Sequence, residues 1–123
     1  MPAPHPLPRY VYKILPSAPP SPIPEPYPLS DLDKKDGFIH LSTSSQVPKT
    51  ADLFFTHSNS IWLFKIPLAK FSQEKVKWED AGESTFPHLY GNFGGSDVED
   101  VSEFKRQDGM TWGQVFQESG WLV

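Results

Sequence analysis

Residues 36–46 read DGFIHLSTSSQ, and the rest of the chain is best interpreted outward from this stretch. Asp36-Gly37 is a turn signal, and the segment FIHLST at 38–43 is predicted to form a short strand. His40 lies in the middle of that apolar strand, and a run of hydroxyl residues follows at its C-terminal end. Such groups need partners, because a buried polar group left unpaired costs about 1–3 kcal/mol.

A second histidine has the same setting. The segment FPHLYG at 86–91 places His88 in another apolar, strand-like stretch. In each segment a hydroxyl-bearing residue, Ser42 or Tyr90, follows the histidine by two positions, and residues two apart share one face of a strand. We therefore expect a polar pocket between the two strands. The alternative, two core histidines bonded to the backbone, stays open.

The remaining segments predict a small α+β domain. Strands are expected at 9–15, at 60–68 in a central position, at 76–80 and near 88–90, and a single helical turn is expected after Ser30. Helices are expected at 44–57, capped by Ser45 with Val47, Ala51, Phe54 and Phe55 on one face, and at 110–121, whereas 96–104 fits either a strand or a helix. Residues 1–8 are predicted to be a flexible proline-rich arm, and 9–123 a single globular domain.

Composition excludes several classes of function. The 123 residues carry a net charge of −4 and no basic cluster, so nucleic acid is not favoured as a partner. The chain has no cysteine, which excludes disulfides and thiol nucleophiles. No apolar run approaches the ~20 residues of a membrane span, and no secretion signal is recognised, so a cytoplasmic location without membrane contact is expected.

A few side chains could carry chemistry in the predicted pocket. Glu79 could orient a histidine, meet a ribose hydroxyl or act as a general base, or it could simply be a solvated strand end. Thr43 and Gln46 could bind a ligand or cap the following helix, whose N-terminus is a natural seat for phosphate. His88 suits acid or base chemistry near neutral pH. The histidine spacing fits no metal motif, so no metal is expected.

These segments also carry a resemblance to a known family. In order, KILP, DGFIHLST, Q with TADLFF, WLFKI, KWE and FPHLYG resemble the family known as domain of unknown function 952, over about Tyr12 to Val101. The resemblance implies an ADP-ribosyltransferase-like fold, with small mixed or antiparallel sheets around a cleft and a few short helices. It also implies NAD as the cofactor.

In relatives of that fold a first-strand residue contacts the adenosine ribose. His40 matches its place, and Ser42 or Thr43 matches the hydroxyl beside it. In one subclass of these relatives a tyrosine on a later element stacks on nicotinamide, and by the resemblance Tyr90 would be its counterpart. By order along the chain, Glu99 or Glu103 would stand for the glutamate that holds the reacting ribose, although neither lies in a recognisable motif.

Two functions are compatible with these residues, and both stay open. In the first, the protein is an NAD-using ADP-ribosyl or phosphate transferase-like enzyme, with Glu79 and His88 catalytic and with His40, Ser42, Thr43, Gln46 and Tyr90 binding the ligand. In the second, the same residues form a non-catalytic module that binds a nucleotide or another phosphate-containing small molecule. A purely structural role for the histidines is the third alternative. The sequence does not address the oligomeric state.

Overall fold

The computed structural model describes residues 3–82 and 84–123, which form two three-stranded antiparallel sheets and three short α-helices. The first sheet has the order β1-β3-β6, made of β1 (Tyr10–Leu15), β3 (Ser60–Pro67) and β6 (Asp100–Lys105). The second has the order β2-β5-β4, made of β2 (Ile39–His40), β5 (Ser84–Leu89) and β4 (Val76–Ala81). The predicted α+β class with small antiparallel sheets is confirmed.

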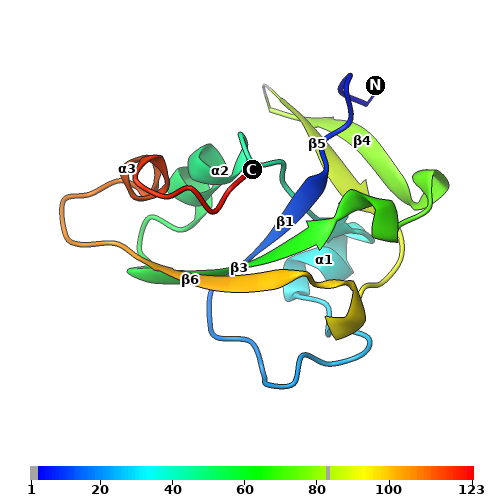
Figure 1. Ribbon diagram of the computed structural model, residues 1–123, viewed down its shortest axis with the longest axis horizontal. Helices are drawn as coiled ribbons and strands as arrows, with labels where there is room; N and C mark the ends of the chain where they lie inside the picture. Colours follow the sequence, from blue (N-terminus) through cyan, green and yellow to red (C-terminus); the bar gives the residue numbers. More distant parts are fainter. Residues whose placement is uncertain (1–2, 83) are drawn as a thin grey trace.

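The helices are α1 (Asp31–Asp36), α2 (Val47–Phe54) and α3 (Trp112–Gln117). Single 3₁₀ turns lie at η1 (Leu68–Lys70), η2 (Gln73–Lys75) and η3 (Gly95–Asp97). Figure 1 shows α2 and α3 on one side of the first sheet, with β4 and β5 on its other side. Within the described residues, no helix has the length and apolar character needed to cross a membrane.

Two hydrophobic cores follow from this layering, and the first sheet separates them. One core lies between the two sheets and buries residues of both: Val11, Leu15, Ile39, Leu41, Phe64, Ile66, Val76, Trp78, Leu89 and Phe93. The other lies between the first sheet and the helices α2 and α3: Tyr10, Tyr12, Val47, Ala51, Ile61, Leu63, Phe104, Trp112 and Phe116. Because β3 contributes to both cores, its near-continuous apolar sequence is explained, and its predicted central position is confirmed.

A backbone bridge joins the two sheets next to the histidine strand. Tyr12 and Ser42 exchange two backbone hydrogen bonds of 2.8 and 2.9 Å. The side chain of Tyr12 makes a separate contact. Its hydroxyl donates to the carbonyl of Val123 and accepts from the Val123 N–H, both at 3.0 Å. The segment 121–123 is thereby held against the first sheet, where Lys65 also donates to the Trp121 carbonyl at 2.6 Å.

Local structure departs from the sequence predictions at α2, and one open choice is settled at β6. Ser45 does not cap α2; Gln46 is the N-cap residue and makes no side-chain cap bond. Phe54, expected on the buried face of α2, is 76% exposed, because α3 covers the side of α2 that carries Val47 and Ala51. Residues 100–105 form a strand, which decides between the two alternatives for that segment.

The strand β5 begins earlier than predicted and passes through Pro87. In a hydrogen-bonded antiparallel pair, two residues exchange both N–H···O bonds. Here the Leu41 N–H donates to the Pro87 carbonyl at 3.2 Å, and the reverse bond cannot form because proline has no N–H. Loss of this one hydrogen bond costs little stability, because β2 is only two residues long and has already ended at His40.

Candidate functional site

The two histidines predicted to share a pocket lie directly opposite each other. His40 on β2 is the register partner of His88 on β5, and their ring centroids are 5.5 Å apart with an interplanar angle of 64°. Side chains alternate along a strand, so both rings lie on the face of the second sheet that turns away from Ile39 and Leu89 in the core. We call this surface, with Phe38, His40, Glu79, His88 and Tyr90, the histidine face.

His40 is held between two carboxylates of α1. Its Nδ1 lies 2.6 Å from Oδ1 of Asp33, which also accepts from the His40 backbone N–H at 3.1 Å. Its Nε2 lies 2.9 Å from Oδ2 of Asp36. Asp33 and Asp36 stand three residues apart and so share one side of the helix. The imidazole is therefore oriented by α1 rather than by its own strand.

The local sequence explains why α1 can present these two acids. The Ser30 side chain accepts from the Asp33 N–H at 3.1 Å and so begins the helix. Gly37 ends it in a left-handed conformation with φ of 82°, which glycine adopts without steric cost. Both ends are predicted from the sequence, and both are confirmed.

Asp33 is the most buried charge of the site. Its other oxygen, Oδ2, pairs with Nζ of Lys13 at 2.7 Å, and Lys13 also donates to the His40 carbonyl at 3.2 Å. Burial raises the pKa of Asp33, but the hydrogen bond from His40 and the charge of Lys13 outweigh it and lower that pKa to about 2. Burial lowers the pKa of Lys13, and Asp33 opposes that shift. The pair joins β1 to α1 and fixes the acid that holds His40.

His88 has a different environment. Its Nδ1 lies 2.8 Å from Oε1 of Glu79, the same oxygen that accepts from the Tyr90 hydroxyl at 2.8 Å. The Phe38 ring stacks on the imidazole at 4.0 Å and 23°. His88 is only 6% exposed, yet its Nε2 has no partner in the described part of the chain. Because every buried polar side-chain atom described there is paired, that nitrogen is not sealed from solvent.

Glu79 joins the second histidine to the rim of the site. The hydrogen bonds from His88 and Tyr90 lower the pKa of Glu79, and the bond to Glu79 raises the pKa of Tyr90. Nζ of Lys77 lies 4.6 Å from the centre of the Tyr90 ring. An ionised carboxylate at Nδ1 favours the tautomer with its proton on that nitrogen. In that tautomer, His88 presents the lone pair of Nε2 outward.

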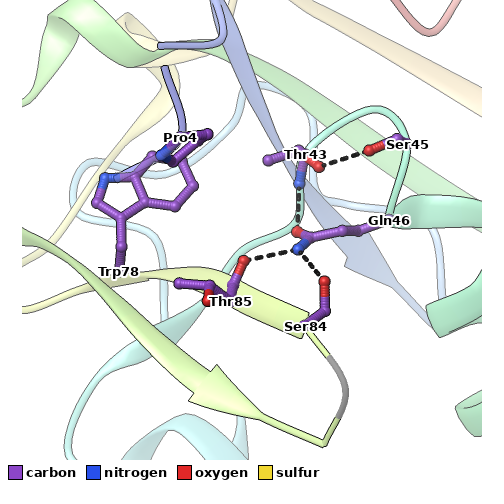
Figure 2. A pocket seen from close by; sticks show the side chains of 7 residues that line it. All are labelled: Pro4, Thr43, Ser45, Gln46, Trp78, Ser84 and Thr85. Carbon is purple, nitrogen blue, oxygen red and sulfur yellow. Dashed lines mark hydrogen bonds between the residues drawn. The ribbon is translucent and has the colours of Figure 1, made fainter. Parts of the chain in front are cut away.

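Thr43 and Gln46 lie elsewhere, in an open pocket of about 320 Å³ shown in Figure 2. The pocket is lined by Pro4, Thr43, Ser45, Gln46, Trp78, Ser84 and Thr85. Trp78 belongs to the core face of β4, so this pocket opens on the side of the second sheet opposite to Glu79. The structure thus brings together His40, Glu79, His88 and Tyr90 but places Thr43 and Gln46 on the other side of the sheet.

The polar groups of Gln46 are already engaged within that pocket. Its Oε1 accepts from the Thr43 N–H at 2.9 Å, and its Nε2 donates to the Thr85 carbonyl at 2.7 Å and to the Ser84 hydroxyl at 3.1 Å. The phosphate site expected at the N-terminus of this helix has few free donors. The Val47 N–H bonds to the Thr43 carbonyl, and Pro48 has no backbone N–H.

The remaining predicted residues are placed as follows. Ser42 is buried in the bridge to Tyr12. Glu99 is exposed and immediately precedes β6, and Glu103 is exposed on β6, so both lie at the first sheet and not on the histidine face.

Sequence reasoning misses four residues of this site: Lys13, Asp33, Asp36 and Phe38. From the sequence alone, Asp33 is part of a helix cap and Asp36 is a turn residue. One signal could have found the ion pair, because Lys13 interrupts a strand that is otherwise apolar, and a lysine there needs a buried acid. In the described residues no group of three or more histidines and acids is arranged to hold a metal ion.

The architecture defines a class of small α+β proteins in which two three-stranded antiparallel sheets enclose one core and the second sheet carries the paired histidines on its outer face. Within that class, the chain belongs to the family described as "Protein of unknown function (DUF952)", whose sequence model matches residues 23–101. The match excludes the KILP segment, so it is shorter than the resemblance inferred from the sequence.

Solved structures of protein CC0527 from Caulobacter crescentus are similar to this chain. The X-ray structure has 28% sequence identity and a TM-score of 0.68, and the alignment covers 83% of this chain and 91% of that one. The solution NMR structure has 26% identity and a TM-score of 0.69, and covers 91% and 97% of the two chains. No curated protein matches the chain. The relatives thus establish family and fold without an activity.

Proposed function

We propose that the histidine face binds a nucleotide or another small phosphate-containing ligand. The observation that supports this most is the state of His88, whose Nδ1 is fixed by Glu79 at 2.8 Å while Nε2 is not sealed from solvent and has no partner among the described residues. A histidine sealed in the core would have both nitrogens satisfied by the protein. A buried ring with one oriented, open nitrogen is instead prepared for a ligand group.

The chemistry of the face fits a polar ligand that also carries a ring. Nε2 of His88 can accept from a ribose or phosphate hydroxyl, and after protonation it can donate to a phosphate oxygen. Phe38 and Tyr90, whose centroids are 5.3 Å apart, offer aromatic surface beside it. Lys77, exposed on the same face of β4, adds a positive charge at the rim.

Nuclear magnetic resonance of the four imidazoles tests this proposal. NAD, ADP-ribose and inorganic phosphate are titrated separately into the protein, and the ring signals of His40 and His88 are expected to shift with saturation. His5 and His57, which are exposed outside the histidine face, serve as internal controls. If none of the three compounds shifts His40 or His88, the proposal is wrong and the histidines are structural.

A second candidate function is favoured by Glu79. Its Oε1 accepts from both His88 and Tyr90, which leaves Oε2 to face a ligand, and the side chain is 39% exposed. In an NAD-using transferase, the bond between nicotinamide and ribose breaks and an acceptor hydroxyl forms a new bond to the ribose. A carboxylate stabilises the positive charge that develops on the sugar, and His88 Nε2 would receive the acceptor's proton.

Release of nicotinamide from NAD, with and without an added nucleophile, tests the second candidate. Glu79→Gln is expected to reduce turnover by at least about a hundredfold, the usual effect of removing one electrostatic stabiliser. Glu103→Gln, which makes the same change on the other sheet, is the matched control. Binding of NAD without any turnover in the unmodified protein would leave the binding function standing and reject the transferase.

A further inference from the structure

Both ring nitrogens of His40 face carboxylates of the same short helix. Nδ1 lies 2.6 Å from Asp33 and Nε2 lies 2.9 Å from Asp36. Both contacts can be favourable together only when each nitrogen carries a proton. As long as Asp36 stays in place, its carboxylate occupies the position beside Nε2 that an anionic group of a ligand would need.

The two acids differ in how firmly they are held. Asp33 is 2% exposed and is fixed by Lys13, by the His40 backbone N–H and by the Ser30 cap. The Asp36 side chain is 34% exposed at the last position of α1, and His40 is its partner among the residues that the structure describes. Asp36 can therefore leave by rotating its own side chain, whereas Asp33 cannot.

We infer that Asp36 occupies an anion subsite at Nε2 of His40, and that a phosphate or carboxylate group of the ligand replaces it. This inference rests on the proposed function of the histidine face. A phosphate oxygen offers the same negative acceptor as Asp36 and restores the contact that Nε2 loses. A neutral group gives a weaker contact, so Asp36 also selects for anionic ligands.

Removal of the Asp36 charge is the direct test. We compare unmodified protein with Asp36→Asn and Asp36→Ala, and we use Asp31→Asn as the matched control, because Asp31 is an exposed acid on the same helix. Inorganic phosphate is titrated while the His40 ring signals are followed. Both Asp36 variants are expected to bind phosphate roughly fivefold more tightly, since partly exposed ion pairs shift equilibria by up to about that factor. The control is expected to match the unmodified protein.

ADP-ribose, followed at His88, separates the two proposals. Tighter phosphate binding at His40 in both Asp36 variants but not in Asp31→Asn supports the subsite. Equal or weaker phosphate binding in the Asp36 variants overturns it, and the proposed function stands if ADP-ribose still shifts His88. Absence of any binding in all four proteins overturns both.

Discussion

Asp33 and Lys13 form a buried ion pair, with Oδ2 of the acid 2.7 Å from Nζ of the lysine and side-chain exposures of 2% and 11%. The pair connects the first strand of one sheet to the helix that holds the histidine of the other. Its removal should therefore affect both stability and the orientation of His40.

Asp33→Asn is expected to destabilise the protein by about 3–5 kcal/mol, because it leaves the Lys13 ammonium buried without a counter-charge. Urea unfolding followed by circular dichroism measures the effect. Asp31→Asn removes an exposed acid of the same helix and should change stability by no more than about 0.5 kcal/mol. Equal effects of the two substitutions would show that the ion pair does not stabilise the fold.

Stability should fall in acid because of the same carboxylate. The pKa of Asp33 in the folded protein is about 2, below the ordinary value of 3.8, so the folded state binds this proton less tightly than the unfolded state does. The stabilisation is complete above about pH 4 and is lost as the pH falls through about 2, and it amounts to about 2 kcal/mol. Carbon-13 detection of the Asp33 carboxyl during an acid titration checks the value directly, and a midpoint near the ordinary one would contradict it.

Glu79→Gln should allow the neutral His88 ring to adopt both of its tautomers. Without the carboxylate at Nδ1, the neutral ring no longer has an ionised acceptor that favours the proton on that nitrogen. Nitrogen-15 shifts of the imidazole are expected to move toward a mixture of both tautomers. The pKa of Tyr90 should fall in the same variant, because the bond to Glu79 raises it. Unchanged nitrogen shifts would mean that Glu79 does not orient the ring.

Away from the histidine face, Asp52 on α2 binds the N-terminus of the neighbouring helix α3. Its two oxygens accept from the backbone N–H groups of Trp112 at 2.6 Å and Gly113 at 3.1 Å. Asp52→Ala should cost about 1–2 kcal/mol, as loss of a side-chain cap usually does. Glu118→Ala, at an exposed position at the end of α3, is the control in the same unfolding measurement. A loss no larger than that of the control would refute the capping role.

Elements with strong local signals are predictable. The cap at Ser30, the stop at Gly37 and the apolar run of β3 each act over a few residues, and each is where the sequence places it. The exposure of Phe54 is not predictable, because it depends on which side of α2 the distant helix α3 covers. Helical periodicity gives a buried face but not its width.

The candidate site is predictable only in part, for the same reason. Repetition of the pattern around His40 and His88 indicates a shared surface, and strand pairing brings the two rings together. The sequence does not show that Glu79 and Gln46 lie on opposite sides of the second sheet. Alternation assigns side chains to the two faces of one strand, but it does not say on which side of that strand a helix after another strand will lie. Asp33 and Lys13 meet across 20 positions, and although Lys13 stands out in its apolar strand, no local pattern identifies Asp33 as its partner.

Tyr12 makes contacts with two parts of the chain that are synthesised at different times. Its hydroxyl bonds to Val123, 111 positions later in the chain, whereas its main chain joins Ser42, only 30 positions later. During translation, the sheet that carries the two imidazoles needs no residue beyond Leu89, whereas the second core also needs Phe104, Trp112 and Phe116. Contacts of such long sequence separation form slowly, so the second core is expected to be completed last.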